Sequence, residues 1–119
     1  MIQERFGEKG ELLFELDLVT AEANLTVEAM LDTGFTEFLA LNKQDIESLD
    51  WLYFDQEELL TAKGFFLFDI YLGRISLNGQ EFQIPVFAGD EIQEILLGSQ
   101  WLKQFDLIAK YQESLLTLG

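Results

Sequence analysis

The sequence predicts a mainly β protein with two short helices, and three observations support this fold class. Hydrophobic residues alternate with other types along residues 12–19 and again along 25–30, the period-two pattern of half-buried strands. Asn78-Gly79 lies between two further hydrophobic segments, which is a strong signal for a tight hairpin. One proline and no Ser/Pro-rich stretch interrupt the 119 residues, so residues 1–119 are expected to form a single domain.

The first half of the chain is expected to hold three strands and a helix. The two alternating segments are joined by residues 20–24, a length that suits a hairpin. Residues 38–41 form a short apolar segment that indicates a third strand. Asn42 then resembles a helix N-cap, and Ile46 and Leu49 fall on one face of the short helix that would follow.

The middle of the chain predicts a second hairpin. Residues 59–61 and 65–72 are expected to pair, with Lys63-Gly64 at the tip of the turn. Gly73 indicates a bulge or a twist in the longer arm. The acidic run 55–58, which precedes this hairpin, is expected to be a solvated loop.

The last third of the chain is expected to contain short elements. Pro85 indicates that the strand after Asn78-Gly79 lies at a sheet edge or carries a bulge. Residues 95–98 predict a short buried strand that ends at a glycine, and residues 99–105 predict a helix of one to two turns. Residues 107–109 and 115–118 are expected to form a final hairpin.

Composition excludes several classes of function. The chain has no His and no Cys, which rules out Ser–His and Cys–His nucleophilic pairs, Cys/His zinc sites and disulfides. The net charge of −15 makes nucleic acid and membrane surfaces unfavourable partners. No metal or cofactor is expected. The N-terminus lacks a basic stretch followed by an apolar run, so we expect no signal peptide and a cytoplasmic protein.

One tripeptide, Asp32-Thr33-Gly34, stands where a predicted buried strand ends. Taken alone, it is ordinary turn chemistry, because Asp bonds its own backbone two residues on and Gly accepts unusual dihedral angles. Its context adds information: Phe35-Thr36 and the apolar segment 38–41 follow it, and some sixty residues later a second apolar strand ends at Leu96-Leu97-Gly98 before a helix.

With these features the sequence resembles the retropepsin-like aspartic proteases, especially their small bacterial members, over roughly residues 11–118. The shared pattern is an apolar pair before Asp-Thr-Gly-Phe-Thr, then Phe-Leu-Ala-Leu, a flap-like Thr61-Ala62-Lys63-Gly64, and a later Leu-Leu-Gly followed by a helix. The resemblance implies a closed β-barrel with a flap hairpin. It also implies a homodimer that cleaves polypeptide bound in an extended conformation.

The implied chemistry needs two carboxylates, and each subunit supplies one Asp32. Two carboxyl groups a few ångströms apart do not both ionise readily, so one keeps a proton. The ionised group can then take a proton from water while the protonated group gives one to the carbonyl oxygen of the peptide. Because one chain has one Asp-Thr-Gly sequence, a monomer would lack half of this site.

The resemblance assigns further roles by position. Thr33 would place its hydroxyl across the dimer axis, and Gly34 would bring backbone close to the carboxylate. Gly98 would lie beneath the active-site loop, where close packing excludes a side chain; a simple turn at the start of a helix is the alternative reading. The positions expected to bind substrate are Thr36, Ala62, Lys63, Gly64 and Gly98.

Three departures from the family pattern keep other functions open. Phe35 replaces the Ser or Thr that bonds the catalytic carboxylate in pepsin-like enzymes, Thr36 stands where viral relatives often carry Asp, and Lys63 replaces the usual flap Asp. The alternative to a peptidase is therefore a catalytically inactive interaction or regulatory module with the same fold. A third reading is an unrelated small β-barrel binding protein in which Asp32-Thr33-Gly34 is only a turn.

Overall fold

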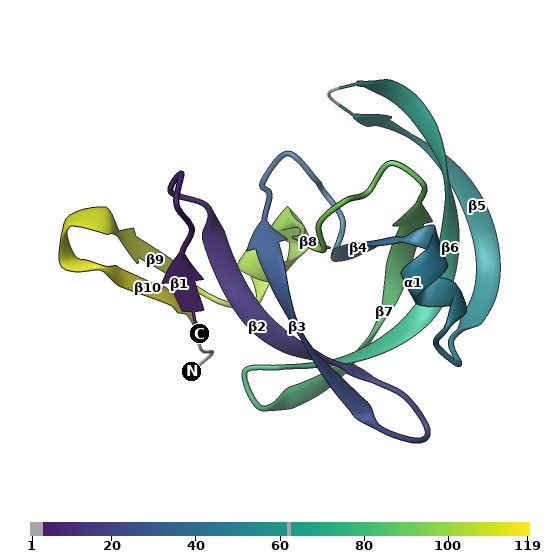
Figure 1. Ribbon diagram of the computed structural model, residues 1–119, viewed down its shortest axis with the longest axis horizontal. Helices are drawn as coiled ribbons and strands as arrows, with labels where there is room; N and C mark the ends of the chain where they lie inside the picture. The colour runs from purple at the N-terminus through teal and green to yellow at the C-terminus, as the bar shows by residue number, and fades with distance from the viewer. Residues whose placement is uncertain (1–3, 62) are drawn as a thin grey trace.

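A computed structural model describes residues 4–61 and 63–119, which form ten strands, one α-helix and two 3-10 helices (Figure 1). The strands are β1 (Glu4–Phe6), β2 (Leu12–Val19), β3 (Asn24–Leu31), β4 (Leu39–Asn42), β5 (Leu52–Thr61), β6 (Gly64–Leu77), β7 (Gln80–Gly89), β8 (Leu96–Leu97), β9 (Leu107–Lys110) and β10 (Leu115–Leu118). The helices are α1 (Lys43–Glu47), η1 (Ser99–Lys103) and η2 (Tyr111–Glu113). The prediction of a mainly β fold is confirmed.

Most strands belong to one strongly curved sheet with the order β1-β2-β3-β8-β4-β7-β6-β5. β2 also pairs with β6, through Asp17 opposite Ser76 and Leu18 opposite Ile75, so the sheet folds back on itself. The β3–β8 and β4–β7 pairs are parallel, whereas the neighbouring pairs are antiparallel. β9 and β10 form a separate hairpin beside β1, and the β5–β6 hairpin lies on the opposite side of the molecule (Figure 1).

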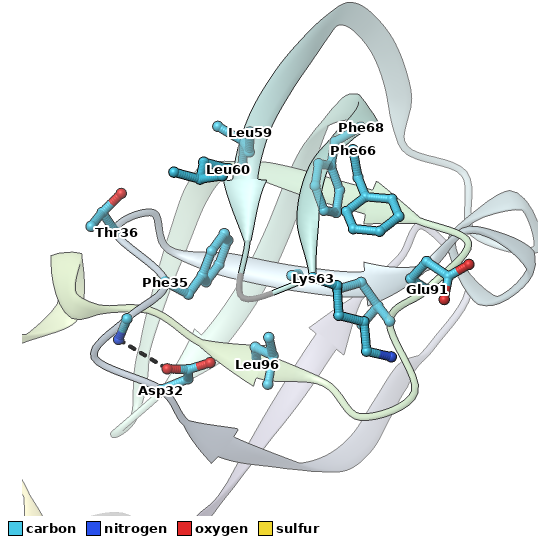
Figure 2. A pocket seen from close by; sticks show the side chains of 13 residues that line it. Asp32, Phe35, Thr36, Leu59, Leu60, Lys63, Phe66, Phe68, Glu91 and Leu96 are labelled. Carbon is cyan, nitrogen blue, oxygen red and sulfur yellow. Dashed lines mark hydrogen bonds between the residues drawn. The ribbon is translucent and has the colours of Figure 1, made fainter.

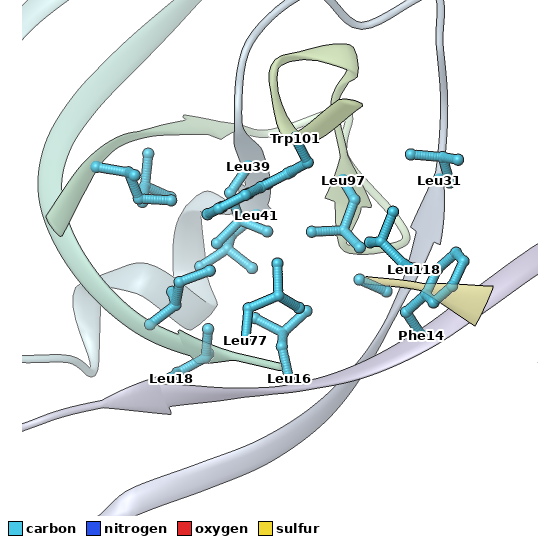
Figure 3. Close-up of a cluster of buried hydrophobic side chains, with 14 of the residues drawn as sticks. Phe14, Leu16, Leu18, Leu31, Leu39, Leu41, Leu77, Leu97, Trp101 and Leu118 are labelled. Atoms are coloured by element: carbon cyan, nitrogen blue, oxygen red, sulfur yellow. The ribbon is translucent and has the colours of Figure 1, made fainter. Parts of the chain in front are cut away.

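The hydrophobic core fills the inside of this curved sheet (Figure 3). The alternation along β2 explains its contribution, because Phe14, Leu16 and Leu18 are buried while Glu15 between them is exposed. Trp101 of η1 is fully buried among leucines from several strands. Burying each such side chain stabilises the fold by about 1.5–3 kcal/mol. The core therefore connects the sheet to the short helix that follows β8.

Several predicted local signals are confirmed. Asn42 caps α1, and its side-chain oxygen accepts a hydrogen bond from the backbone N–H of Gln44. Asn78 and Gly79 both have positive φ, which suits the tight turn between β6 and β7. Pro85 pairs with β6 on one side only, because the pairing of β7 with β4 begins one residue later, at Val86. The proline therefore lies where one edge of β7 has no hydrogen-bonded neighbour strand among the described residues.

Other local predictions are wrong. Residues 55–58 are not a loop but part of β5, paired one-to-one with β6, although their side chains are exposed as expected. Strand β1 was not predicted, since three residues give no periodic signal. The predicted helix over 99–105 is the shorter 3-10 helix η1, and η2 is an additional short turn.

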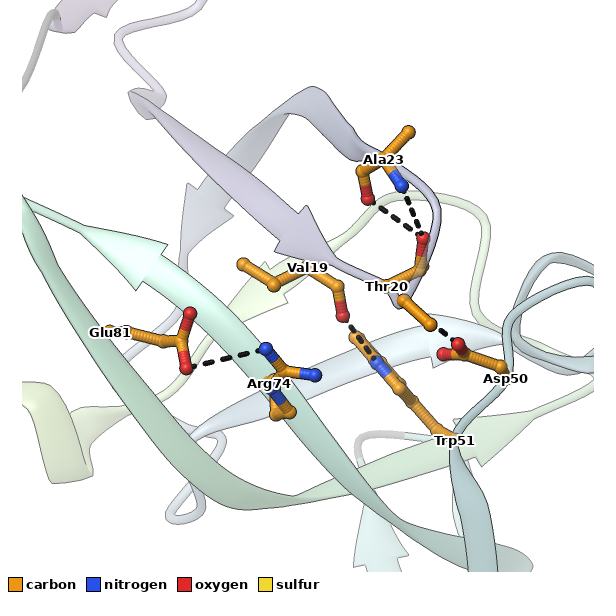
Figure 4. A network of polar contacts seen from close by, with 8 residues as sticks. Val19, Thr20, Ala23, Asp50, Trp51, Arg74 and Glu81 are labelled. Carbon is orange, nitrogen blue, oxygen red and sulfur yellow. Dashed lines mark hydrogen bonds and ion pairs between the residues drawn. The ribbon is translucent and has the colours of Figure 1, made fainter.

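Gly73 does not mark a bulge, because its pairing with β7 is continuous. The irregularity in register lies instead on β5, between Tyr53 and Asp55. A Cβ atom at Gly73 would stand 2.5 Å from Val86 Cγ2 and 3.0 Å from the ring of Trp51, so this position needs a residue without a side chain. Figure 4 shows that Trp51 also donates a hydrogen bond from Nε1 to the carbonyl oxygen of Val19 at 2.9 Å.

Candidate active site

Asp32 is the first residue after β3, and backbone contacts fix its position. Its N–H donates to the carbonyl oxygen of Leu97 in the neighbouring strand β8 at 2.9 Å. Its side-chain Oδ1 accepts from the N–H of Gly34 at 2.9 Å, as the dashed line in Figure 2 shows. Its own carbonyl oxygen accepts from the N–H of Phe35 at 3.1 Å. The tripeptide is thus an Asx turn that holds a half-buried carboxylate in a defined orientation.

Gly98 lies directly beneath the loop that follows Asp32. A Cβ atom here would stand 1.8 Å from the carbonyl oxygen of Glu37 and 2.8 Å from that of Phe35, both of them backbone atoms. The close approach allows the Gly98 N–H to donate to Phe38 O at 2.9 Å and the Ser99 N–H to donate to Phe35 O at 2.8 Å. Gly98 is also the N-cap residue of η1, so the close packing and the turn at the start of a helix occur together.

Two side chains of η1 reach the same loop. Gln100 donates from Nε2 to the carbonyl oxygen of Thr36 at 2.9 Å. Trp101 donates from Nε1 to the carbonyl oxygen of Phe38 at 2.8 Å, and its ring packs edge-on against the Phe38 ring. Residues 98–101 therefore donate hydrogen bonds to backbone carbonyl oxygens of the loop that carries Asp32, although the two segments are far apart in the sequence.

A cavity of about 350 Å³ opens above this loop (Figure 2). Its walls come from the loop after β3, from the β5–β6 hairpin and from the segment between β7 and β8. The lining residues are Asp32, Gly34, Phe35, Thr36, Ala40, Leu59, Leu60, Lys63, Phe66, Phe68, Glu91, Ile92 and Leu96. The walls are mostly apolar, with three charged groups, and such a site suits a ligand with a large apolar part.

The structure brings some of the predicted site residues to this cavity. Asp32, Gly34, Thr36 and Lys63 line it. The other predicted residues stand elsewhere: Thr33 is exposed on the turn outside the lining, Gly64 begins β6, Gly98 is buried under the loop, and Ala62 lies outside the described residues.

Sequence reasoning missed part of the cavity wall. Glu91 and Ile92 belong to a segment without a periodic pattern, so nothing in the sequence marked them. Phe66 and Phe68 both line the cavity, and Phe68 is also buried in a small apolar cluster. Phe65, one residue earlier on the strand, points to the other face and is exposed.

Two carboxyl groups near the cavity have pKa values that are shifted in opposite directions. Burial raises the pKa of Glu37, in the loop after Asp32, and the charge of Glu57 on β5 raises it further. The pKa of Asp69 is lowered, first by a hydrogen bond from Gln56 and then by Lys43. A proton is therefore held more readily at Glu37, while Asp69 stays ionised into more acidic solution.

Two features are absent from the described residues. Within residues 4–61 and 63–119, no three Asp or Glu side chains are grouped so that they could hold a metal ion. The helices in this part of the chain are too short and too polar to cross a bilayer.

The chain is similar in structure to proteases of known fold. A crystal structure of a retropepsin-like aspartic protease from Rickettsia conorii matches with a TM-score of 0.70 and 23% sequence identity, over 99% of this chain and 91% of that chain. The solution structure of the simian foamy virus (mac) protease matches with a TM-score of 0.55 and 18% identity, over 86% of this chain and 97% of that chain. No protein-family profile matches the chain, and no curated protein matches its sequence significantly. The chain has the fold of the retropepsin-like aspartic proteases.

Proposed function

We propose that this protein is an aspartic endopeptidase, active as a homodimer in which each subunit supplies one Asp32. One observation carries the proposal: the Asp32 carboxyl group lies in the wall of a largely apolar cavity beneath a hairpin, on a loop held by residues 98–101. The proposal includes closure of the curved sheet into a barrel, which the β2–β6 pairing supports.

In the proposed reaction the two Asp32 side chains share one proton. The ionised carboxylate removes a proton from water, and the new C–O bond forms at the peptide carbonyl carbon as the other carboxyl group protonates the carbonyl oxygen. Collapse of the tetrahedral gem-diol intermediate breaks the C–N bond: the proton held by the first carboxyl group passes to the leaving nitrogen, and one gem-diol hydroxyl returns its proton to the second carboxylate. The Gly34 N–H contributes by holding Oδ1, so that the carboxyl plane is set before substrate arrives.

The proposed substrate is a polypeptide in an extended conformation, lying between the Asp32 loop and the β5–β6 hairpin. The backbone of an extended chain can form hydrogen bonds along both of its edges, and its alternate side chains can enter pockets. This mode of binding suits a cavity that is apolar and covered by a hairpin. Thr36 and Lys63 line this cavity and are proposed to contact substrate. Ala62 and Gly64 are proposed to contact substrate as well. Thr33 is proposed to bond across the dimer axis, and Gly98 to position the loop.

Asp32→Asn tests the proposal on a library of quenched fluorescent peptides at acid pH. Replacing the carboxyl group by an amide removes the proton transfer, so cleavage should fall by at least about 10²–10⁴-fold while the circular dichroism spectrum stays unchanged. The matched control is Asp106→Asn, which makes the same chemical change at an exposed residue after η1 and should cleave like the parent. Equal cleavage by the Asp32→Asn variant and the parent would refute the assignment.

The second candidate, an inactive interaction module, is favoured by Phe35. Its ring packs edge-on against Phe87 at a centroid distance of 6.0 Å and lines the cavity where a hydroxyl would support a catalytic carboxylate. A parent protein that forms a folded dimer and yet cleaves no peptide in the library would establish this candidate over the peptidase.

A further inference from the structure

Asp69 is the one charged side chain that is buried in the part of the chain the structure describes, with 9% of its surface exposed. Lys43 Nζ lies 3.0 Å from its Oδ2, and Gln56 donates from Nε2 to its Oδ1 at 2.8 Å. Burial of an ionised carboxylate is unfavourable unless such partners are present. The contact therefore fixes three segments relative to one another: α1, β5 and β6.

This contact lies midway along the β5–β6 hairpin, where β6 separates from β7: the β6–β7 pairing ends at Asp69 opposite Ala88, whereas the β5–β6 pairing continues beyond it. Gln56 and Asp69 are opposite each other in the strand register, and the pairing continues from them to Thr61 opposite Gly64 at the tip. Phe68, the neighbour of Asp69, lines the cavity from the other face of the strand. Lys43 thus fixes the hairpin next to the point where it begins to cover the cavity.

Asn42, the residue before Lys43, fixes a second wall of the same cavity. Its Nδ2 donates to the carbonyl oxygen of Ile92 at 3.0 Å, and Ile92 lines the cavity from the segment between β7 and β8. Two adjacent residues at the start of α1 therefore fix two walls, one from the hairpin and one from the segment that faces it.

The outer face of the hairpin offers little other support in the described structure. Phe65 and Leu67 on this face are 66% and 59% exposed, respectively. The five residue steps from Gln56 to Thr61 span about 17 Å at about 3.3 Å per residue, so a rotation of about 10° at Gln56 moves Thr61 by about 3 Å. A small change at Asp69 is therefore amplified at the tip.

We propose that Lys43 and Asp69 are positioning residues, whose ion pair holds the β5–β6 hairpin at the distance from the Asp32 loop at which substrate is bound. The inference rests on the proposed function for its kinetic consequence. Its structural part, that the ion pair restrains the hairpin, can be tested whether or not the protein is an enzyme.

The test compares Lys43→Met with Arg74→Met in the full chain. Both variants remove one positive charge, but Arg74 belongs to an exposed ion pair with Glu81, at 3.5 Å on the β6–β7 hairpin (Figure 4). Hydrogen exchange is measured over residues 55–69 and over the rest of the chain, and peptide cleavage gives KM and kcat. In Lys43→Met, exchange over 55–69 and KM should both rise by about 2- to 30-fold while kcat changes less. Arg74→Met should match the parent.

Two further variants separate positioning from general destabilisation. Asp69→Asn keeps an oxygen that can accept from Gln56 but removes the charge, and should shift exchange and KM in the same direction by a smaller factor. Lys43→Arg keeps the charge and should restore both values. Equal acceleration of exchange along the whole chain, or no change over 55–69, would overturn the proposal. Absence of cleavage by the parent would contradict the proposed function, while the exchange result still decides whether the ion pair restrains the hairpin.

Discussion

Gly98→Ala is the substitution for which the structure predicts the largest effect per added atom. The backbone at Gly98 is extended, with φ −88° and ψ 176°, which any residue adopts, so the change brings no strain in the dihedral angles. The added Cβ, however, would stand 1.8 Å from the carbonyl oxygen of Glu37 and 2.6 Å from its carbonyl carbon. The neighbouring atoms are backbone, so no side chain can rotate away to relieve the contact.

The expected loss of stability follows from these distances. Overpacking usually costs about 1–3 kcal/mol, and a backbone contact this short places Gly98→Ala at the upper end of that range. Movement of the loop also weakens the hydrogen bonds from Gly98 and Ser99 to Phe38 and Phe35. We expect a loss of about 3 kcal/mol. With an unfolding entropy of about 0.25 kcal/mol/K for a chain of this length, the melting temperature should fall by about 12 °C.

Thermal and urea unfolding followed by circular dichroism measure this loss. Gly79→Ala is the matched control, because its Cβ would meet no atom within 4 Å but its φ of +78° is unfavourable for alanine. That strain costs about 1–2 kcal/mol, which corresponds to about 4–8 °C. If Gly98→Ala loses no more stability than Gly79→Ala, the packing of the Asp32 loop on Gly98 is not as described.

Two further predictions concern pH. Sedimentation should show more dimer at about pH 4.5 than at about pH 7.5, since protonation of carboxylates toward the isoelectric point of about 4.1 reduces the repulsion between two chains of charge −15; equal populations would contradict this. The raised pKa of Glu37 means that the folded state binds its proton more tightly than the unfolded state, so this residue adds stability as pH falls through its folded pKa. Glu37→Gln should remove that gain and raise stability at neutral pH, measured by urea unfolding across pH. Glu22→Gln, which makes the same change at an exposed turn, is the matched control.

The strands that carry the core could be predicted because their burial pattern has a simple period. In β2 and β3 one face is apolar and the other polar, so the sequence specifies both the strand and its orientation. The Asn78-Gly79 turn could be predicted for a related reason, since few residue pairs adopt positive φ at both positions. Asp32 was found because it stands at the end of such a strand.

The features that could not be predicted depend on tertiary structure and have no local pattern in the sequence. Residues 55–58 form an exposed, acidic run, which is typical of a loop, although their backbone pairs with β6. Glu91 and Ile92 reach the cavity through the path of an irregular segment, which depends on where β7 and β8 are placed by the rest of the sheet. The closeness of Lys43 to Asp69 depends in the same way on tertiary structure, as does the contact beneath Gly98.

The dependence of the Asp32 turn on η1 has a consequence for a growing chain. Gln100 and Trp101 bond to the loop across sequence separations of 64 and 63 residues. During synthesis Asp32 emerges from the ribosome long before the segment that supports its loop, so the hydrogen bonds from Gln100 and Trp101 cannot form in the interval. The loop that carries Asp32 therefore reaches its supported geometry only after residues 98–101 have been made.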